Sequence, residues 1–270
     1  MPTMHPSESL AAEYSAKAAA YARHWAPVIR PMALPLLELL PLSSASLVLD
    51  VGTGTGSLVA DLQAAGPHAT ILGVDRAEGM LREGRHALPH PLAVMDVQDL
   101  GIRSGAIDVA LLVFVLFHTP DPSRSLTEVR RVLHGGGAVG IVTWGEDPGL
   151  PGLSIWNEEL DQEGAGPDQR DRSVMQQGLM DTPEKLSALL KGVGYVRLRI
   201  WGLTFRHLWT VEDLLAAQIG CGMAARRLAG LSAIARARCT SRVEARLNEL
   251  THAGLTYCPE VLCAVAHRPV

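Results

Sequence analysis

The sequence predicts an α/β fold in which helices cover both faces of a doubly wound, mostly parallel sheet. Residues 47–51 form a short apolar segment that leads through closely spaced glycines into an amphipathic stretch ended by Gly66-Pro67. This pattern indicates a strand, a tight turn and a helix. Residues 107–117 are apolar apart from Asp108, which is typical of a central parallel strand buried on both faces.

The remaining strands and helices follow from periodicity and end signals along the chain. Helices are predicted over 8–25, 31–40, 122–133, 153–162 and 183–191, with two or three more within 211–250. Strands are predicted over 47–51, 69–75, 107–117, 138–144, 194–205 and 259–267, and another begins at residue 92. We expect an N-terminal helical lid (1–44), a core (45–205), a helical cap (206–258) and the last core strand (259–270).

The glycine turn predicts a nucleotide site, because a backbone without Cβ atoms lets a ligand approach a helix N-terminus closely. Its spacing excludes the usual dinucleotide fingerprint G-x-G-x-x-G, since Ser57 or Val59 takes the place of the third glycine. A P-loop is excluded as well, because no lysine lies nearby. What remains is a carboxylate, Asp50, followed by Gly52, Gly54 and Gly56.

This acid and glycine pattern resembles the first motif of the class I S-adenosylmethionine-dependent methyltransferases. In that family the acid and the turn hold the cationic amino-acid tail of the cofactor, and a strand-end carboxylate would repel a pyrophosphate. The resemblance implies a Rossmann-like, seven-stranded sheet with strand order 3-2-1-4-5-7-6. It also implies S-adenosyl-L-methionine as cofactor and S-adenosyl-L-homocysteine as product.

Acidic residues follow the next two strands at the spacing expected for the rest of the cofactor. Asp75 lies about twenty residues after the glycines and can accept hydrogen bonds from a ribose diol. The resemblance assigns Asp96 to the adenine amino group, with Asp99 as the alternative. In full, it implies cofactor contacts from Asp50, Gly52, Thr53, Gly54, Gly56, Asp75, Arg76, Met80, Asp96, Val97, Val113 and His118.

Residues 45–145 are similar to the subgroup that contains the ubiquinone-biosynthesis methyltransferases, of the methyltransferase type 11 kind. The matching positions are Asp108, His118, Pro120, Asp121, Glu128, Arg131, Val132, Leu133, Gly136 and Gly137. His134-Gly135 replaces the usual basic residue and proline. Because Val113 stands where relatives often have a polar residue, its cofactor contact would come from the backbone.

His118 is the predicted general base, because it follows the fourth strand at the crevice and an unperturbed histidine titrates near neutrality. A base contributes roughly 10²–10⁴-fold when the acceptor is a hydroxyl or an activated carbon. A purely structural role for this histidine stays open. Substrate contacts are predicted from Tyr14, Tyr21, Phe117 and Trp144, although packing is the alternative for the two tyrosines.

Composition favours a cytoplasmic protein acting on small molecules. The net charge of −4 argues against a nucleic-acid protein governed by bulk charge, although arginines cluster within 226–246. The four cysteines lack C-x-x-C spacing, so we expect neither a metal site nor disulfides. The N-terminal residues show no secretory signal, and the apolar run at 109–117 is too short to span a bilayer.

These features together predict methyl transfer to a small, largely apolar acceptor, such as a secondary metabolite or a quinone-like molecule. An RNA or other nucleic-acid methyltransferase is one alternative, although the Asn/Asp-Pro-Pro-Tyr/Phe and Pro-Cys motifs of such enzymes do not occur. The other is a methyltransferase fold repurposed for non-methylating chemistry such as cyclisation. The sequence does not indicate whether oxygen, nitrogen or carbon is methylated, nor the oligomeric state.

Overall fold

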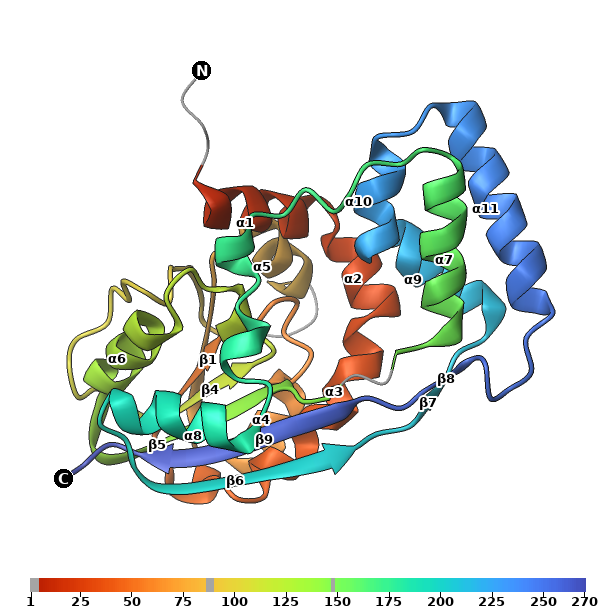
Figure 1. Ribbon diagram of the computed structural model, residues 1–270. Coiled ribbons are helices and arrows are strands. Elements are labelled where there is room, and N and C mark those ends of the chain that lie inside the picture. The colour runs from red at the N-terminus through yellow and green to blue at the C-terminus, as the bar shows by residue number, and fades with distance from the viewer. Residues whose placement is uncertain (1–4, 86–89, 147–148) are drawn as a thin grey trace.

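The computed structural model describes residues 5–85, 90–146 and 149–270, and its centre is a seven-stranded sheet (Figure 1). The strands lie in the order β3-β2-β1-β4-β5-β9-β6, and β9 runs antiparallel to both of its neighbours. Counted along the chain within this sheet, the order is 3-2-1-4-5-7-6, so the predicted fold is confirmed. The bounds are β1 Leu47–Val51, β2 Thr70–Asp75, β3 Leu92–Val94, β4 Ile107–Val113, β5 Leu133–Trp144, β6 Val196–Thr204 and β9 Glu260–His267.

The central strands are buried on both faces, as their continuous apolar sequences predict. Ile107, Val109 and Leu111 of β4 have no exposed surface. The apolar run does not stay a strand to residue 117, however. Phe114 adopts φ +56°, a left-handed conformation that ends the strand at Val113, and a short 3-10 helix, η2 (Leu116–His118), follows. This turn brings His118 back over the end of the sheet.

Helices cover both faces of the sheet (Figure 1). α6 (Pro122–Val132) and α8 (Pro183–Gly192) pack against each other in front of β5 and β6, and α3 (Ala26–Leu37) and α4 (Val59–Ala65) lie behind. Close contact is needed at β5, where a Cβ on Gly140 would stand 2.8 Å from Leu40 Cδ1. α5 (Glu78–Arg85) follows β2 and flanks the edge formed by β2 and β3.

The N-terminal segment forms two short helices where a single helix over 8–25 was expected. They are α1 (Pro6–Ala16) and α2 (Ala18–His24), and the chain turns between them at Lys17, which has φ −110° and ψ 10°. Neither glycine nor proline marks this break, so the apolar pattern alone could not reveal it. The predicted helix over 31–40 is α3, which begins and ends earlier.

Three helices between β6 and β9 form a separate layer with α7 (Pro151–Gln162). They are α9 (Val211–Gly220), α10 (Met223–Ala229) and α11 (Ala233–Asn248), and α9 also packs on α2. The small ladder of β7 (His207–Leu208) and β8 (Thr256–Tyr257) joins this layer to the sheet. Among the described residues, no helix is long and apolar enough to cross a membrane.

Candidate functional site

A cavity lies at the carboxyl ends of β1, β2 and β4, beneath α1 and α2. It encloses about 850 Å³ of empty space, counted with its open mouth. Of the residues predicted to bind cofactor or substrate, it brings together Tyr14, Tyr21, Gly52, Gly54, Asp75, Arg76, Met80, Asp96, Val97, Val113 and His118. Sequence reasoning did not assign Ser7, Leu10, Met95 or Thr119 to the site, and no motif in the sequence marks them.

Glycine is required at each of the three positions of the turn after β1. Gly52, Gly54 and Gly56 have φ values of +69°, +57° and +74°, which side-chain-bearing residues rarely adopt. Space is restricted as well, since a Cβ on Gly52 would stand 2.2 Å from Val115 Cγ2. The turn therefore exposes bare backbone to the cavity, and the Gly54 N–H donates to Asp75 Oδ2 over 2.9 Å.

Asp50 is a buried acid at the end of β1, with 2% of its surface exposed. It lines a smaller hollow that shares Tyr21, Gly52 and Gly54 with the cavity above. Arg30 also lines this hollow, but its guanidinium pairs with Asp61. Burial raises the pKa of Asp50 to about 6. Within the described part of the chain, no lysine, arginine or histidine forms an ion pair with it. A cationic ligand would therefore meet an unneutralised carboxylate here.

The Asp75 carboxylate is fixed by backbone donors on both sides of the cavity floor. Oδ2 accepts from Gly54, and Oδ1 accepts from the Ala77 N–H over 2.8 Å. Burial raises its pKa, and the bonds from backbone N–H groups act in the opposite sense. Each carboxylate oxygen has two lone pairs, so Asp75 keeps acceptor capacity for two further hydroxyl groups.

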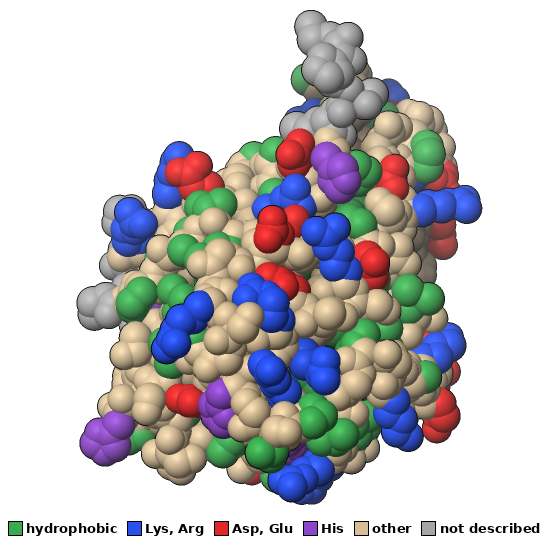
Figure 2. Space-filling model, turned by 90° about the vertical axis from the view of Figure 1, so that its left-hand side faces the viewer, with side chains coloured by type: hydrophobic (Ala, Val, Ile, Leu, Met, Phe, Trp, Pro, Cys, Tyr) green, Lys and Arg blue, Asp and Glu red, His purple; other side chains and the backbone are tan. Residues whose placement is uncertain are grey.

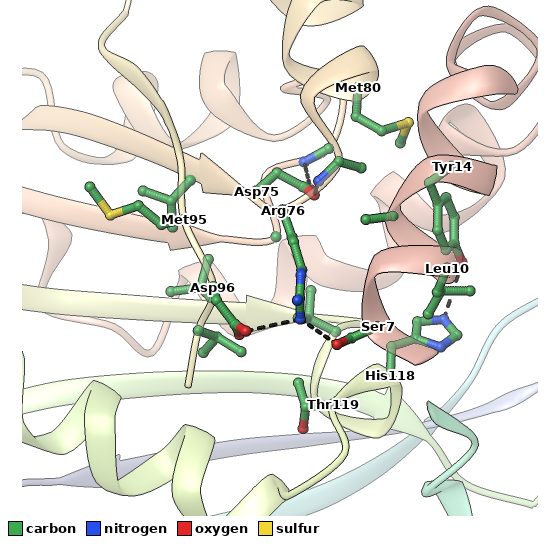
Figure 3. Close-up of a pocket in the computed structure, with 18 of the residues that line it drawn as sticks. Ser7, Leu10, Tyr14, Asp75, Arg76, Met80, Met95, Asp96, His118 and Thr119 are labelled. Carbon is green, nitrogen blue, oxygen red and sulfur yellow. Dashed lines mark hydrogen bonds and ion pairs between the residues drawn. The ribbon is translucent and has the colours of Figure 1, made fainter. Parts of the chain in front are cut away.

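Arg76 crosses the cavity between the sheet and the lid (Figure 3). Its Nη1 donates to Asp96 Oδ2 over 2.9 Å and also to the Ser7 hydroxyl of α1. The other Asp96 oxygen accepts from the Gln98 N–H over 3.0 Å. Asp99, the alternative adenine contact, donates its own N–H to the Asp96 carbonyl. A ligand that uses Asp96 must therefore share it with Arg76 or displace Arg76.

His118 is bonded to the lid rather than free in the cavity. Its Nε2 lies 3.1 Å from the Tyr14 hydroxyl, and its Nδ1 lies 3.4 Å from the Val174 carbonyl oxygen. Burial lowers the pKa of His118 to about 4 and raises that of Tyr14 to about 12. The expectation that His118 titrates near neutrality is therefore wrong, because burial disfavours the imidazolium. Both side chains are uncharged at neutral pH.

Aromatic rings form the wall beside this pair. Tyr21 lies with its ring centroid 5.9 Å from that of Tyr14, and Phe114 lines the cavity at the end of β4. The other two predicted substrate residues, Phe117 and Trp144, do not line the cavity but pack behind residues that do. Phe117 packs against the His118 ring with centroids 4.3 Å apart, and Trp144 packs against Phe114 at 4.2 Å.

Comparison with known proteins agrees with this geometry. Residues 49–141 match the methyltransferase domain family. This stretch, about a third of the chain, runs from β1 to β5 and is similar to a methyltransferase domain. An uncharacterized methyltransferase of Mycobacterium tuberculosis is 38% identical over 105 residues, which are 38% of this chain and 42% of that protein. A ubiquinone/menaquinone biosynthesis C-methyltransferase of a Geobacter species is 31% identical over 118 residues, 41% of this chain and 50% of that protein. The chain thus spans about half or less of these curated relatives.

Solved structures share the fold of this chain. The YcgJ protein of Bacillus subtilis has a TM-score of 0.57 and 16% identity, covering 89% of this chain and 99% of that one. A phosphoethanolamine N-methyltransferase of Haemonchus contortus, solved with S-adenosylhomocysteine, has a TM-score of 0.53 and 20% identity over 89% of this chain and 53% of that one. The [4+2]-cyclase SpnF has a TM-score of 0.54 and 18% identity, covering 89% and 82%.

The arginines of α10 and α11 pair with acids of neighbouring elements. Arg238, Arg242 and Arg246 of α11 pair with Glu158, Glu159 and Glu163, along and just beyond α7. Arg226 and Arg227 of α10 pair with Glu13, Asp161 and Asp168. Basic and acidic side chains are also interspersed on the face in Figure 2. The arginine cluster is therefore largely neutralised by its own fold.

Proposed function

We propose that this protein transfers a methyl group from S-adenosyl-L-methionine to a small, largely apolar acceptor. The observation that carries the proposal is Asp50, a buried carboxylate that forms no ion pair with any residue the structure describes. It lies in a hollow that shares Gly52 and Gly54 with the cavity containing Asp75 and Asp96. When bound, S-adenosyl-L-methionine supplies an electrophilic methyl group on a positively charged sulfur.

The residues present fit this cofactor. Asp50 offers its ammonium group a buried counter-charge, and the bare backbone of Gly52 and Gly54 leaves room for the chain that joins it to the sulfur. Asp75 has acceptor capacity for the ribose diol. Asp96 and the backbone of Val97 lie at the far end, where the adenine ring would lie among apolar side chains such as Met80 and Met95.

The acceptor region supports a ligand without charge. Once the cofactor is placed at the glycine turn, the remaining wall includes Leu10, Phe114 and Val115. Such walls stabilise an apolar ligand by roughly 25 cal/mol per Å² of buried surface and keep water away from the reacting atoms. Holding the reactants at attack distance can supply roughly 7–11 kcal/mol of the barrier reduction.

Two other functions were open from the sequence. An RNA substrate is disfavoured by the ion pairs that neutralise the arginines of α10 and α11 and by the net charge of −4. Non-methylating chemistry has a precedent on this fold in SpnF, which is named a [4+2]-cyclase. That alternative predicts cofactor binding without formation of S-adenosylhomocysteine.

Cofactor binding is tested by calorimetry with S-adenosylmethionine, S-adenosylhomocysteine and NAD. We expect the first two to bind and NAD not to bind. Gly54→Val should abolish binding, because a Cβ there meets Met80 Cε at 3.3 Å in a backbone conformation with φ +57°. Gly101→Val is the matched control, since no atom lies within 4 Å of its Cβ position. Binding of NAD alone would refute the proposal.

Methyl transfer is tested with methyl-labelled cofactor and a panel of phenols, enols and amines that differ in apolar surface. We expect label to appear in an apolar member of the panel, together with one equivalent of S-adenosylhomocysteine. Conversion of a panel member without release of S-adenosylhomocysteine would favour the cyclase-like alternative. Transfer of label to RNA but to no small molecule would replace the proposed acceptor class.

A further inference from the structure

The bond between Tyr14 and His118 joins two residues that are 104 positions apart in the sequence and that both line the cavity. Tyr14 comes from α1 of the lid, and His118 comes from the turn after β4 (Figure 3). Their rings meet edge to face with centroids 5.8 Å apart. The histidine is therefore reached from the cavity beside, or through, a tyrosine hydroxyl.

The second partner of His118 decides which way the hydrogen bonds run. The Val174 carbonyl can only accept, so a neutral His118 that bonds to it must carry its proton on Nδ1. In the neutral ring Nε2 then carries a lone pair and accepts the Tyr14 O–H. The Tyr14 hydroxyl donates its only proton to this bond. Toward a bound molecule the Tyr14 oxygen can therefore act only as an acceptor for an O–H or N–H group.

We infer that Tyr14 is the residue that contacts the nucleophilic atom of the acceptor, and that His118 acts on this atom only through the Tyr14 hydroxyl. This inference rests on the proposed function. It assigns the acceptor to molecules whose nucleophile carries a proton, namely a hydroxyl, an enol or an amine. A thioether or a tertiary amine offers Tyr14 no donor and would be held less well.

The proton has a defined route in this arrangement. As the lone pair of the nucleophile forms a bond to the methyl carbon, the electrons of the carbon–sulfur bond pass to sulfur. The proton of the nucleophile moves to Tyr14 Oη, and the phenolic proton moves to His118 Nε2. One positive charge is thus lost at sulfur and one appears on the imidazole. While the sulfonium is present its field opposes imidazolium formation, so the proton follows the methyl group rather than preceding it.

Contacts on both sides of α1 hold Tyr14 at His118. Glu13, next to Tyr14, accepts from Arg226 Nη1 over 3.0 Å, and Arg226 is also paired with Asp168. On the other side of α1, the Ser15 hydroxyl accepts the Gly79 N–H of α5 over 3.1 Å. Tyr14 is therefore held between two anchored neighbours, which fixes its hydroxyl at His118.

The pair is tested first without an acceptor, by nitrogen NMR of histidine-labelled protein. We expect Tyr14→Phe to shift the Nε2 resonance of His118 and to leave affinity for S-adenosylhomocysteine nearly unchanged. Tyr195→Phe is the matched control, because it removes another buried phenol hydroxyl, which donates to the Leu126 carbonyl away from the cavity. A His118 resonance that does not respond to Tyr14→Phe would overturn the inference.

Turnover is then measured with the acceptor panel. We expect Tyr14→Phe and His118→Asn each to lower kcat by roughly 10²–10⁴-fold. The double variant should be no slower than the slower single variant, because residues that act as a unit are not additive. Wild-type turnover of a hydroxyl acceptor should be independent of pH through the neutral range. The charged groups that face the pair are Glu13 on α1, Asp75 at the end of β2, Arg170 on the loop after α7 and Arg226 on α10.

Each failure has a distinct meaning. If the wild type binds S-adenosylhomocysteine but methylates no panel member, the proposed function and this inference fall together. If the wild type methylates a hydroxyl acceptor and Tyr14→Phe does so equally fast, only the inference falls. Additive losses in the double variant would show that His118 contacts the acceptor itself. Should Tyr14→Phe not fold, His118→Gln tests the same bond from its other side.

Discussion

At the scale of single residues, the buried carboxylate of Asp50 lowers the free energy of unfolding. Its pKa is about 6 because burial penalises the carboxylate, whereas the unfolded chain ionises near the ordinary value of about 3.9. Above pH 6 the folded protein therefore carries a penalty of roughly 3 kcal/mol at this one position. The residue is best explained by a ligand that removes the penalty.

Asp50→Asn should therefore separate stability from binding. We expect the free energy of unfolding of the variant at pH 7 to exceed that of the wild type by up to about 3 kcal/mol, because the buried charge is gone. The variant should therefore unfold at a higher denaturant concentration. Affinity for S-adenosylhomocysteine should fall at the same time. Denaturation and calorimetry measure the two effects. A variant that is less stable at pH 7 and binds normally would show that the Asp50 charge serves the fold alone.

Cofactor binding should also release protons at Asp50. Near pH 6 the carboxyl group of the free protein is about half protonated, and a bound ammonium group would lower its pKa. Calorimetry with S-adenosylhomocysteine at pH 6, repeated in buffers of different ionisation enthalpy, counts the protons released. We expect release at pH 6 that disappears at pH 8 and is absent in Asp50→Asn. Equal heats in all buffers would contradict this link.

At the scale of elements, α1 packs closely on α5 beside the cavity. A Cβ on Gly79 would stand 2.5 Å from the Ser15 carbonyl oxygen, so the two helices touch through a bare backbone position. The same helix supplies Ser7, Leu10 and Tyr14 to the cavity. Displacing α1 from α5 should therefore open the cavity without disturbing the sheet.

Gly79→Ala tests this directly. We expect weaker binding of S-adenosylhomocysteine and faster proteolysis within residues 5–24, with little change in the unfolding of the core. Gly192→Ala, at the end of α8, is the control, because no atom lies within 4 Å of its Cβ position. Unchanged affinity in Gly79→Ala would mean that the contact between α1 and α5 does not govern access to the site.

At the scale of the whole molecule, the contributions of Asp50 and His118 to stability change with pH in opposite directions. Asp50 has a raised pKa, so its contribution to the free energy of unfolding is lost as pH rises from about 4 to about 6. His118 has a pKa lowered to about 4, so the unfolded chain binds its proton first and stability is lost as pH falls from about 6.5 to about 4. Between pH 4 and 6 the two effects largely cancel.

Chemical denaturation across this range should expose the cancellation. Relative to the wild type, Asp50→Asn should gain stability as pH rises from 4 to 6, and His118→Asn should lose it. Acids held by arginine, such as Asp168 with a pKa lowered to about 2, titrate below this window and leave the comparison intact. Parallel profiles for the wild type and both variants would contradict the assignment.

The sheet could be predicted from the sequence because its signals are local, whereas the detail of the site depends on distant contacts. Apolar runs and the glycine turn identify strands and the cofactor loop within a few residues. The left-handed turn at Phe114 carries no glycine and leaves no such mark. The state of His118 depends on Tyr14 and Val174, which are 104 and 56 residues away. Likewise, Arg76 meets Ser7 across 69 residues.

The position of β9 has a consequence for how the chain folds. β9 lies between β5 and β6, so β6 joins the seven-stranded sheet only through a strand that is made more than fifty residues later. During synthesis the edge of β5 that pairs with β9 therefore stays unpaired while α7 to α11 emerge from the ribosome. Pairings over such separations form slowly, and open strand edges recruit other chains. Pairing of β9 with β5 and β6 would close both edges in one step, so folding yield should depend on how well nascent chains are kept apart before β9 is available.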